Sequence, residues 1–160
     1  MTKKQKEIIL PLLRKQDEER NYLERYLVEY KEFLNVADMF TDFCCERAEG
    51  KEQYSAMIEE IIKRDNAAKI FVEVYGFEEE ADGTDIFIYS ETLIIFTVLP
   101  DEQIQEVIDM SGDIFPSDFG EANQDNSQMN EAFVVDAEGK LNSVIQYCEE
   151  KRRMLYFWWD

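Results

Sequence analysis

The stretch Thr-Leu-Ile-Ile-Phe-Thr-Val-Leu, residues 92–99, decides the fold class of this chain. Its apolar run from Leu93 to Phe96 has no polar residue at alternate positions, so a strand formed here is apolar on both faces. Strands of that kind lie inside a sheet whose two faces are both covered. We therefore expect residues 92–99 to form a central strand.

Other segments of strand length surround this stretch, separated by turn residues. Ser90-Glu91 joins the central strand to the one before it, and the acidic turn Glu78–Asp85 separates that strand from an earlier one. Residues 137–140 connect two strands as a hairpin. The predicted strands are Ile70–Tyr75, Asp85–Tyr89, Thr92–Leu99, Ala132–Asp136, Leu141–Gln146 and Met154–Trp159.

The first 66 residues show helical spacing instead. From Tyr22 to Cys44, apolar and aromatic residues recur at intervals of three and four, which predicts one long helix. Pro11 is expected to separate it from an earlier short helix. A second helix is expected at Lys51–Arg64, and a short third one from Pro100 to about Met110.

These elements predict an α+β fold. We expect a single domain over residues 1–160, with two N-terminal helices packed on a mainly antiparallel sheet of about five to six strands and one further short helix. Residues 1–66 form its helical part and residues 67–160 its sheet-bearing part. A chain of 160 residues that is 45% hydrophobic can bury a substantial core.

The charge of the chain is strongly negative. Lys and Arg number 17 against 36 Asp and Glu, for a net charge of −19. Residues 1–66 contain 12 basic and 15 acidic residues, whereas residues 67–160 contain 5 and 21. This balance argues against direct binding to nucleic acid or to anionic membranes, because both need clustered Lys and Arg.

The residue inventory excludes several kinds of chemistry. The chain has no histidine, which rules out Ser-His-Asp and Cys-His mechanisms. Its three cysteines, Cys44, Cys45 and Cys148, form no disulfide framework, so we expect a reducing cytoplasmic location. No run of about 18 apolar residues is present to span a membrane. We predict no catalytic residues, no metal ligands and no cofactor.

The strongest functional signal is a stretch without bases. Between Ile70 and Gly139 there are 18 acidic residues and no Lys or Arg. Gathered on one face, these carboxylates would attract a basic partner and repel wrong ones. The alternative is that they are scattered over several faces of an acidic protein.

Two groups of residues are candidate partner contacts. One is the acidic turn, and the other is the polar loop Ser111–Asn130, where Phe115 and Phe119 either anchor a partner or tuck under the loop. The predicted partner-binding residues are Glu78, Glu79, Glu80, Asp82, Asp113, Phe115, Asp118, Phe119 and Glu121. In the C-terminal strand, Phe157 and Trp159 are expected to oppose Tyr156 and Trp158, with one pair in the core.

Charge and size together favour a non-enzymatic binding protein that neutralises or regulates a basic protein partner, either a toxin or a nucleic-acid-binding protein. Small acidic proteins of this kind include immunity proteins and inhibitors that mimic DNA. One alternative is a structural or adaptor protein that forms a homodimer through the Tyr22–Phe43 helix. Another is an enzyme that depends on carboxylates or a divalent metal.

Overall fold

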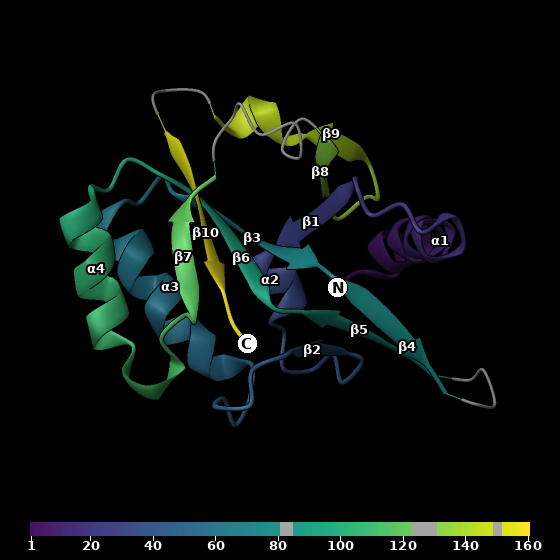
Figure 1. Cartoon of the computed structure of the whole chain (residues 1–160), viewed down its shortest axis with the longest axis horizontal. Coiled ribbons are helices and arrows are strands. Elements are labelled where there is room, and N and C mark those ends of the chain that lie inside the picture. Colours follow the sequence, from purple (N-terminus) through teal and green to yellow (C-terminus); the bar gives the residue numbers. More distant parts are fainter. Residues whose placement is uncertain (81–84, 123–130, 149–151) are drawn as a thin grey trace.

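A computed structural model describes residues 1–80, 85–122, 131–148 and 152–160 of the chain (Figure 1). The helices are α1 (Lys3–Glu19), α2 (Tyr30–Phe33), α3 (Glu52–Arg64) and α4 (Asp101–Met110), with 3₁₀ turns η1 (Gly112–Ile114) and η3 (Val144–Tyr147). The strands are β1 (Arg25–Glu29), β2 (Thr41–Phe43), β3 (Lys69–Val74), β4 (Gly76–Glu79), β5 (Ile86–Ser90), β6 (Thr92–Thr97), β7 (Asp118–Glu121), β8 (Ala132–Val135), β9 (Leu141–Ser143) and β10 (Arg153–Trp158).

The strands form two sheets. The larger has seven strands in the order β7-β10-β6-β3-β1-β8-β9, and the smaller has three in the order β2-β5-β4. All neighbours in the larger sheet are antiparallel except β1 and β8. The α+β class is confirmed, whereas the expected layout of five to six strands below two N-terminal helices is wrong.

Strand β6 lies between β10 and β3, as its apolar run predicted. Leu93 to Phe96 are all buried, because each face of the sheet has its own cover. On one face the strands contribute alternate residues such as Val72 and Leu93 to the main core, which all four helices complete. On the other face Phe71 and Ile94 belong to a smaller cluster that η3 covers.

The two sheets share one long hairpin. β3 pairs with β6 in the larger sheet, and the chain continues on both sides into β4 and β5, which pair in the smaller sheet. The register does not change across the boundary, since Glu73 lies opposite Thr92 and Gly76 lies opposite Tyr89. Ser90-Glu91 joins β5 to β6, as the sequence predicted, and the two strands belong to different sheets.

The predicted long helix over Tyr22–Phe43 is wrong. This segment forms β1, the single turn α2 and β2. Tyr26, Leu27 and Val28 are buried because β1 lies between β3 and β8 with both faces covered. A run of apolar residues in such a strand satisfies helical spacing as well, so periodicity alone could not separate the two.

Pro11 does not break the first helix, which also contradicts the sequence interpretation. α1 continues through Pro11 from a capping box at Thr2. Ile9 and Leu13, on either side of Pro11, are buried in the main core, and this packing offsets the lost backbone hydrogen bond. None of the helices in the described part of the chain is long and apolar enough to cross a membrane.

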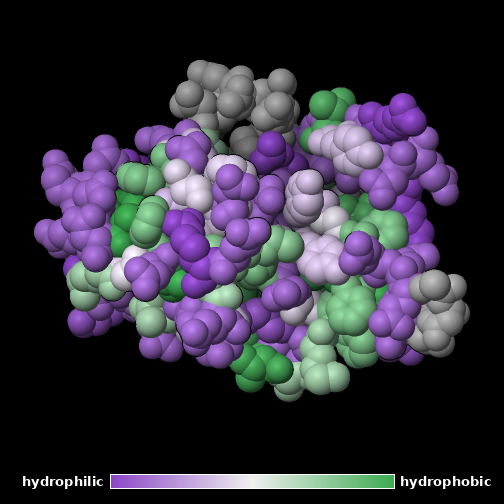
Figure 2. All heavy atoms as spheres, turned by 60° about the horizontal axis from the view of Figure 1, so that its bottom comes forward, coloured by the Kyte–Doolittle hydropathy of each residue, from purple (hydrophilic) through white to green (hydrophobic). Residues whose placement is uncertain are grey.

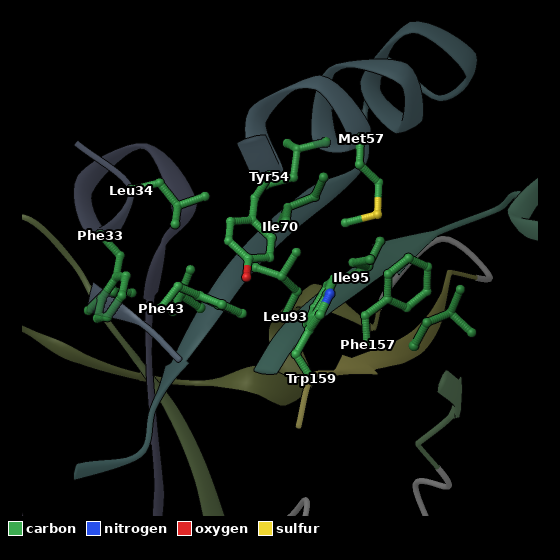
Figure 3. Close-up of a cluster of buried hydrophobic side chains, with 14 of the residues drawn as sticks. Phe33, Leu34, Phe43, Tyr54, Met57, Ile70, Leu93, Ile95, Phe157 and Trp159 are labelled. Atoms are coloured by element: carbon green, nitrogen blue, oxygen red, sulfur yellow. The ribbon is translucent and has the colours of Figure 1, made fainter. Parts of the chain in front are cut away.

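The C-terminal strand alternates as the sequence predicted. Phe157 and Trp159 are fully buried, whereas Tyr156 and Trp158 are half-buried on the opposite face. Trp159 packs edge-on against Phe43 and Tyr54, and its indole nitrogen donates to the backbone oxygen of Ile114 at 2.9 Å (Figure 3).

Asp65 joins three parts of the fold. Its carboxylate accepts hydrogen bonds from the Thr97 hydroxyl at 2.8 Å and the Val98 backbone at 3.1 Å, and it pairs with Arg152 at 3.0 Å. Burial alone would raise the pKa of Asp65, but these hydrogen bonds and the Arg152 charge hold it below its ordinary value. Asp65 therefore links the end of α3 to β6 and to the start of β10.

Replacing Trp159 with alanine is expected to lower the free energy of unfolding by about 3–5 kcal/mol, because it leaves a cavity among packed aromatic rings. The neighbouring Trp158→Ala substitution removes the same side chain from a half-buried site and is expected to cost clearly less. Denaturant unfolding measures both. Equal losses would contradict the alternation in β10.

Asp65→Asn is expected to lower the free energy of unfolding by about 2–3 kcal/mol at neutral pH, because charged hydrogen bonds and the ion pair with Arg152 are lost. The pKa of Asp65 is lowered on folding, so its contribution is present above the ordinary carboxyl pKa and is lost as the pH falls through the folded pKa. The difference in free energy of unfolding between wild type and variant should therefore disappear at acid pH. A gap that persists at about pH 2 in urea unfolding would contradict this account.

Candidate functional site

A groove of about 700 Å³ opens where the smaller sheet leaves the larger one. It lies on the second face of the larger sheet, because Glu73, Thr92 and Tyr156 have the same strand parity as Phe71, Ile94 and Met154 of the smaller apolar cluster. This face is thus apolar at one end and polar at the other. The groove is lined by Gln16, Asp17, Tyr22, Glu24, Arg25, Glu73, Val74, Tyr75, Gly76, Phe77, Glu91, Thr92, Asp118, Tyr156 and Trp158.

The bend of the long hairpin forms one side of the groove. Residues 74–77 line it as the chain passes from β3 to β4, and Glu91 lines it on the returning strand. The end of α1 forms another side, held by a hydrogen bond of 2.6 Å from the Gln16 amide to the Glu24 backbone oxygen. β7 contributes Asp118 beside the end of β10.

Five carboxylates and one arginine line the groove. Three of the carboxylates are held by phenols: Tyr156 donates to Asp118 at 3.0 Å, Tyr22 donates to Asp17, and Tyr26, just outside the lining, donates to Glu24. These hydrogen bonds raise the pKa of Tyr156 and of Tyr22.

A neutral phenol orients a carboxylate without cancelling its charge. Among the described residues, no ion pair joins Asp17, Glu24, Glu91 or Asp118 to a lysine or arginine. The groove therefore has an uncompensated negative charge.

Glu73 differs from these carboxylates because it is almost buried and has a cationic partner. Its side chain is 17% exposed, and a carboxylate oxygen lies 3.2 Å from an Arg25 nitrogen. Burial raises the pKa of Glu73, and the charge of Arg25 opposes that shift. This ion pair forms the floor of the groove.

Aromatic rings form much of the groove wall. Tyr22 and Tyr75 are 63% and 66% exposed, so their rings are available for contact. The ring of Tyr156 lies over Gly120, where an added Cβ would come within 3.2 Å of it. A glycine at this position lets the Tyr156 hydroxyl reach Asp118.

The predicted acidic turn lies beside the groove but is partly tied to the protein. Glu78 accepts a hydrogen bond from Tyr89 at 2.8 Å, and Glu79 pairs with Arg14 of α1. Glu80 is exposed at the end of β4. Asp82 lies outside the described residues.

Most of the predicted contacts in residues 111–122 lie outside the groove. Asp113 is exposed in η1, and Glu121 in β7 lies 3.8 Å from Arg153. Phe115 is 47% exposed beneath the Arg47 guanidinium, whereas the Phe119 ring packs on Phe157. Of these residues only Asp118 lines the groove, and residues 123–130 lie outside the described part of the chain.

Among the described residues, the carboxylates between Ile70 and Gly139 do not share one face. Asp101 and Glu106 lie on α4, Glu79 on β4, and Asp136 beside the β8–β9 turn, which are separate parts of the molecule (Figure 1). The surface in Figure 2 is correspondingly hydrophilic, with apolar residues in small separate patches. Sequence reasoning missed most of the groove, because its residues come from separate segments and Asp17, Tyr22 and Glu24 precede the acidic stretch.

The described residues give little support for a metal site or for cysteine chemistry. They contain no group of three or more Cys, Asp or Glu side chains arranged to hold a metal ion. Cys44 is exposed and Cys45 half-buried after β2.

Arg25→Gln tests the groove floor, because it leaves the Glu73 carboxylate almost buried without its cation. We expect the free energy of unfolding to fall by about 2 kcal/mol at pH 8. This is less than the loss expected for a fully buried ion pair, because the Arg25 side chain is a third exposed. A raised carboxyl pKa favours the folded state as the pH falls, so the loss should shrink towards pH 5. In the control Arg25→Gln/Glu73→Gln this pH dependence should disappear, and its persistence in chemical unfolding would contradict the assignment.

No protein-family model, curated protein or solved structure matches this chain. Its functional interpretation therefore rests on the groove and on the distribution of charge.

Proposed function

We propose that this chain is a non-enzymatic acidic binding protein that neutralises or regulates a basic protein partner, such as a toxin or a nucleic-acid-binding protein. The observation that carries the proposal is the groove, where five carboxylates are accompanied by one arginine. A concave site in which one sign of charge predominates concentrates field lines and attracts a partner of the opposite sign.

The arrangement of the groove favours binding over catalysis. Glu73 is the lining carboxylate whose pKa burial raises, and its pairing with Arg25 is that of a structural ion pair. The remaining carboxylates of the groove lie near solvent beside aromatic rings, which suits contact with a protein surface. The alternative of a dimer through a helix at Tyr22–Phe43 has lost its basis, because that segment forms two strands and a single helical turn in place of a long helix.

Affinity capture tests the proposal. The purified chain is used as bait at low salt in an extract of its source, beside a bait carrying Glu91→Gln and Asp118→Asn. We expect a basic protein that binds the first bait, binds the second less and is released as the salt concentration rises. A captured protein that is acidic, or bound equally by both baits at every salt concentration, would overturn the proposal.

Association kinetics with the captured partner give a second test. Reversing Glu78, Glu79 and Glu80 to Lys beside the groove should slow association by roughly tenfold at low salt, because steering depends on charge near the contact. Folding should be preserved, since exposed ion pairs such as Glu79 with Arg14 contribute little.

The matched control reverses Glu102, Glu106 and Asp109 on α4, where one carboxylate also pairs with an arginine, Arg64. Its total charge change is the same, but it lies away from the groove. Equal slowing in both variants, measured by stopped flow, would show that net charge and not the β4 carboxylates steers the partner.

A further inference from the structure

We propose that the groove receives arginine side chains from an extended segment of the basic partner. This inference rests on the proposed function and names the chemistry that the groove recognises.

The carboxylates of the groove are suited to a ligand with several donors. Asp118 accepts one hydrogen bond from Tyr156 and retains other acceptor positions, and Glu91 has no ion pair among the described residues. A guanidinium group presents five N–H donors in a rigid plane, so one arginine can bridge two oxygens. An ammonium group is a compact point charge without this geometry.

The aromatic walls also favour arginine. Guanidinium planes stack on the faces of tyrosine and tryptophan rings, and Tyr22, Tyr75 and Trp158 line the groove. The chain already contains such contacts at its surface. Arg14 lies over Phe77, a lining residue, with 5.8 Å between the guanidinium carbon and the ring centre. Arg47 lies over Phe115 at 4.4 Å.

The dimensions of the groove fit a chain segment. A volume of about 700 Å³ exceeds what one side chain fills and lies within the range of ligand sites. At Gly76, apart from the adjoining residues, no atom lies within 4 Å of the position of an added Cβ, so a backbone can approach there. An extended loop or tail with arginines at intervals would place them against both Glu91 and Asp118.

Defined peptides test the inference on the purified chain. Three unstructured peptides of the same sequence carry arginine, lysine or neutral citrulline at the same positions, and calorimetry measures their binding at about 50 mM salt. We expect the arginine peptide to bind at least about fivefold more tightly than the lysine peptide, and the citrulline peptide to bind weakest, since it retains shape but has no charge.

Variants locate the binding in the groove. Glu91→Gln/Asp118→Asn should weaken binding of the arginine peptide by roughly tenfold or more, because the two side chains that would accept hydrogen bonds from a guanidinium lose their charge. Glu102→Gln/Asp109→Asn on α4 makes the same charge change on exposed residues and should alter affinity by less than about twofold. Trp158→Phe should reduce the preference for arginine over lysine, because a phenyl ring makes a weaker cation–π interaction than an indole ring.

The outcomes separate the inference from the function on which it rests. Equal affinity for the arginine and lysine peptides, still lost in the groove variant, would overturn the arginine preference and leave the proposed function intact. Binding unaffected by Glu91→Gln/Asp118→Asn would overturn the groove as the site. If neither peptide binds and no basic partner is captured, the inference and the proposed function both fail.

Discussion

The pairing of β3 with β6 is the constraint on which the rest of the structure depends. Both strands lie inside the larger sheet, and their apolar residues supply both clusters. The same hairpin continues in register into β4 and β5, where the chain leaves the larger sheet. The groove lies at this departure, because residues 74–77 turn away from the sheet face that Glu73 and Thr92 still share. The central core and the candidate site are therefore two parts of one hairpin.

The sequence predicted the elements whose patterns have a single interpretation. The run from Leu93 to Phe96 identified the central strand, and the alternation of the last residues separated Phe157 and Trp159, which are fully buried, from Tyr156 and Trp158. The segment Tyr22–Phe43 was misassigned because a strand buried on both faces satisfies helical spacing as well. Pro11 was misjudged because burial of Ile9 and Leu13 outweighs a local preference.

The candidate site was less accessible to sequence reasoning than the fold. The base-free stretch drew attention to residues 70–139, but folding distributes those carboxylates over α4, β4 and the β8–β9 turn. Of the described members of that set, Glu73, Glu91 and Asp118 line the groove, where they meet Asp17 and Glu24 from the less acidic N-terminal part. Proximity of this kind comes from strand order and from the docking of α1, and neither leaves a local pattern in the sequence.

The contact between Gly120 and Tyr156 has a consequence for the groove. Since a methyl group at position 120 would come within 3.2 Å of the Tyr156 ring, a substitution there would shift the phenol that donates to Asp118. Under the proposed function, such a shift would change recognition of the partner while every charged residue of the groove is retained. In that role, the edge strand β7 would alter recognition without any change in net charge.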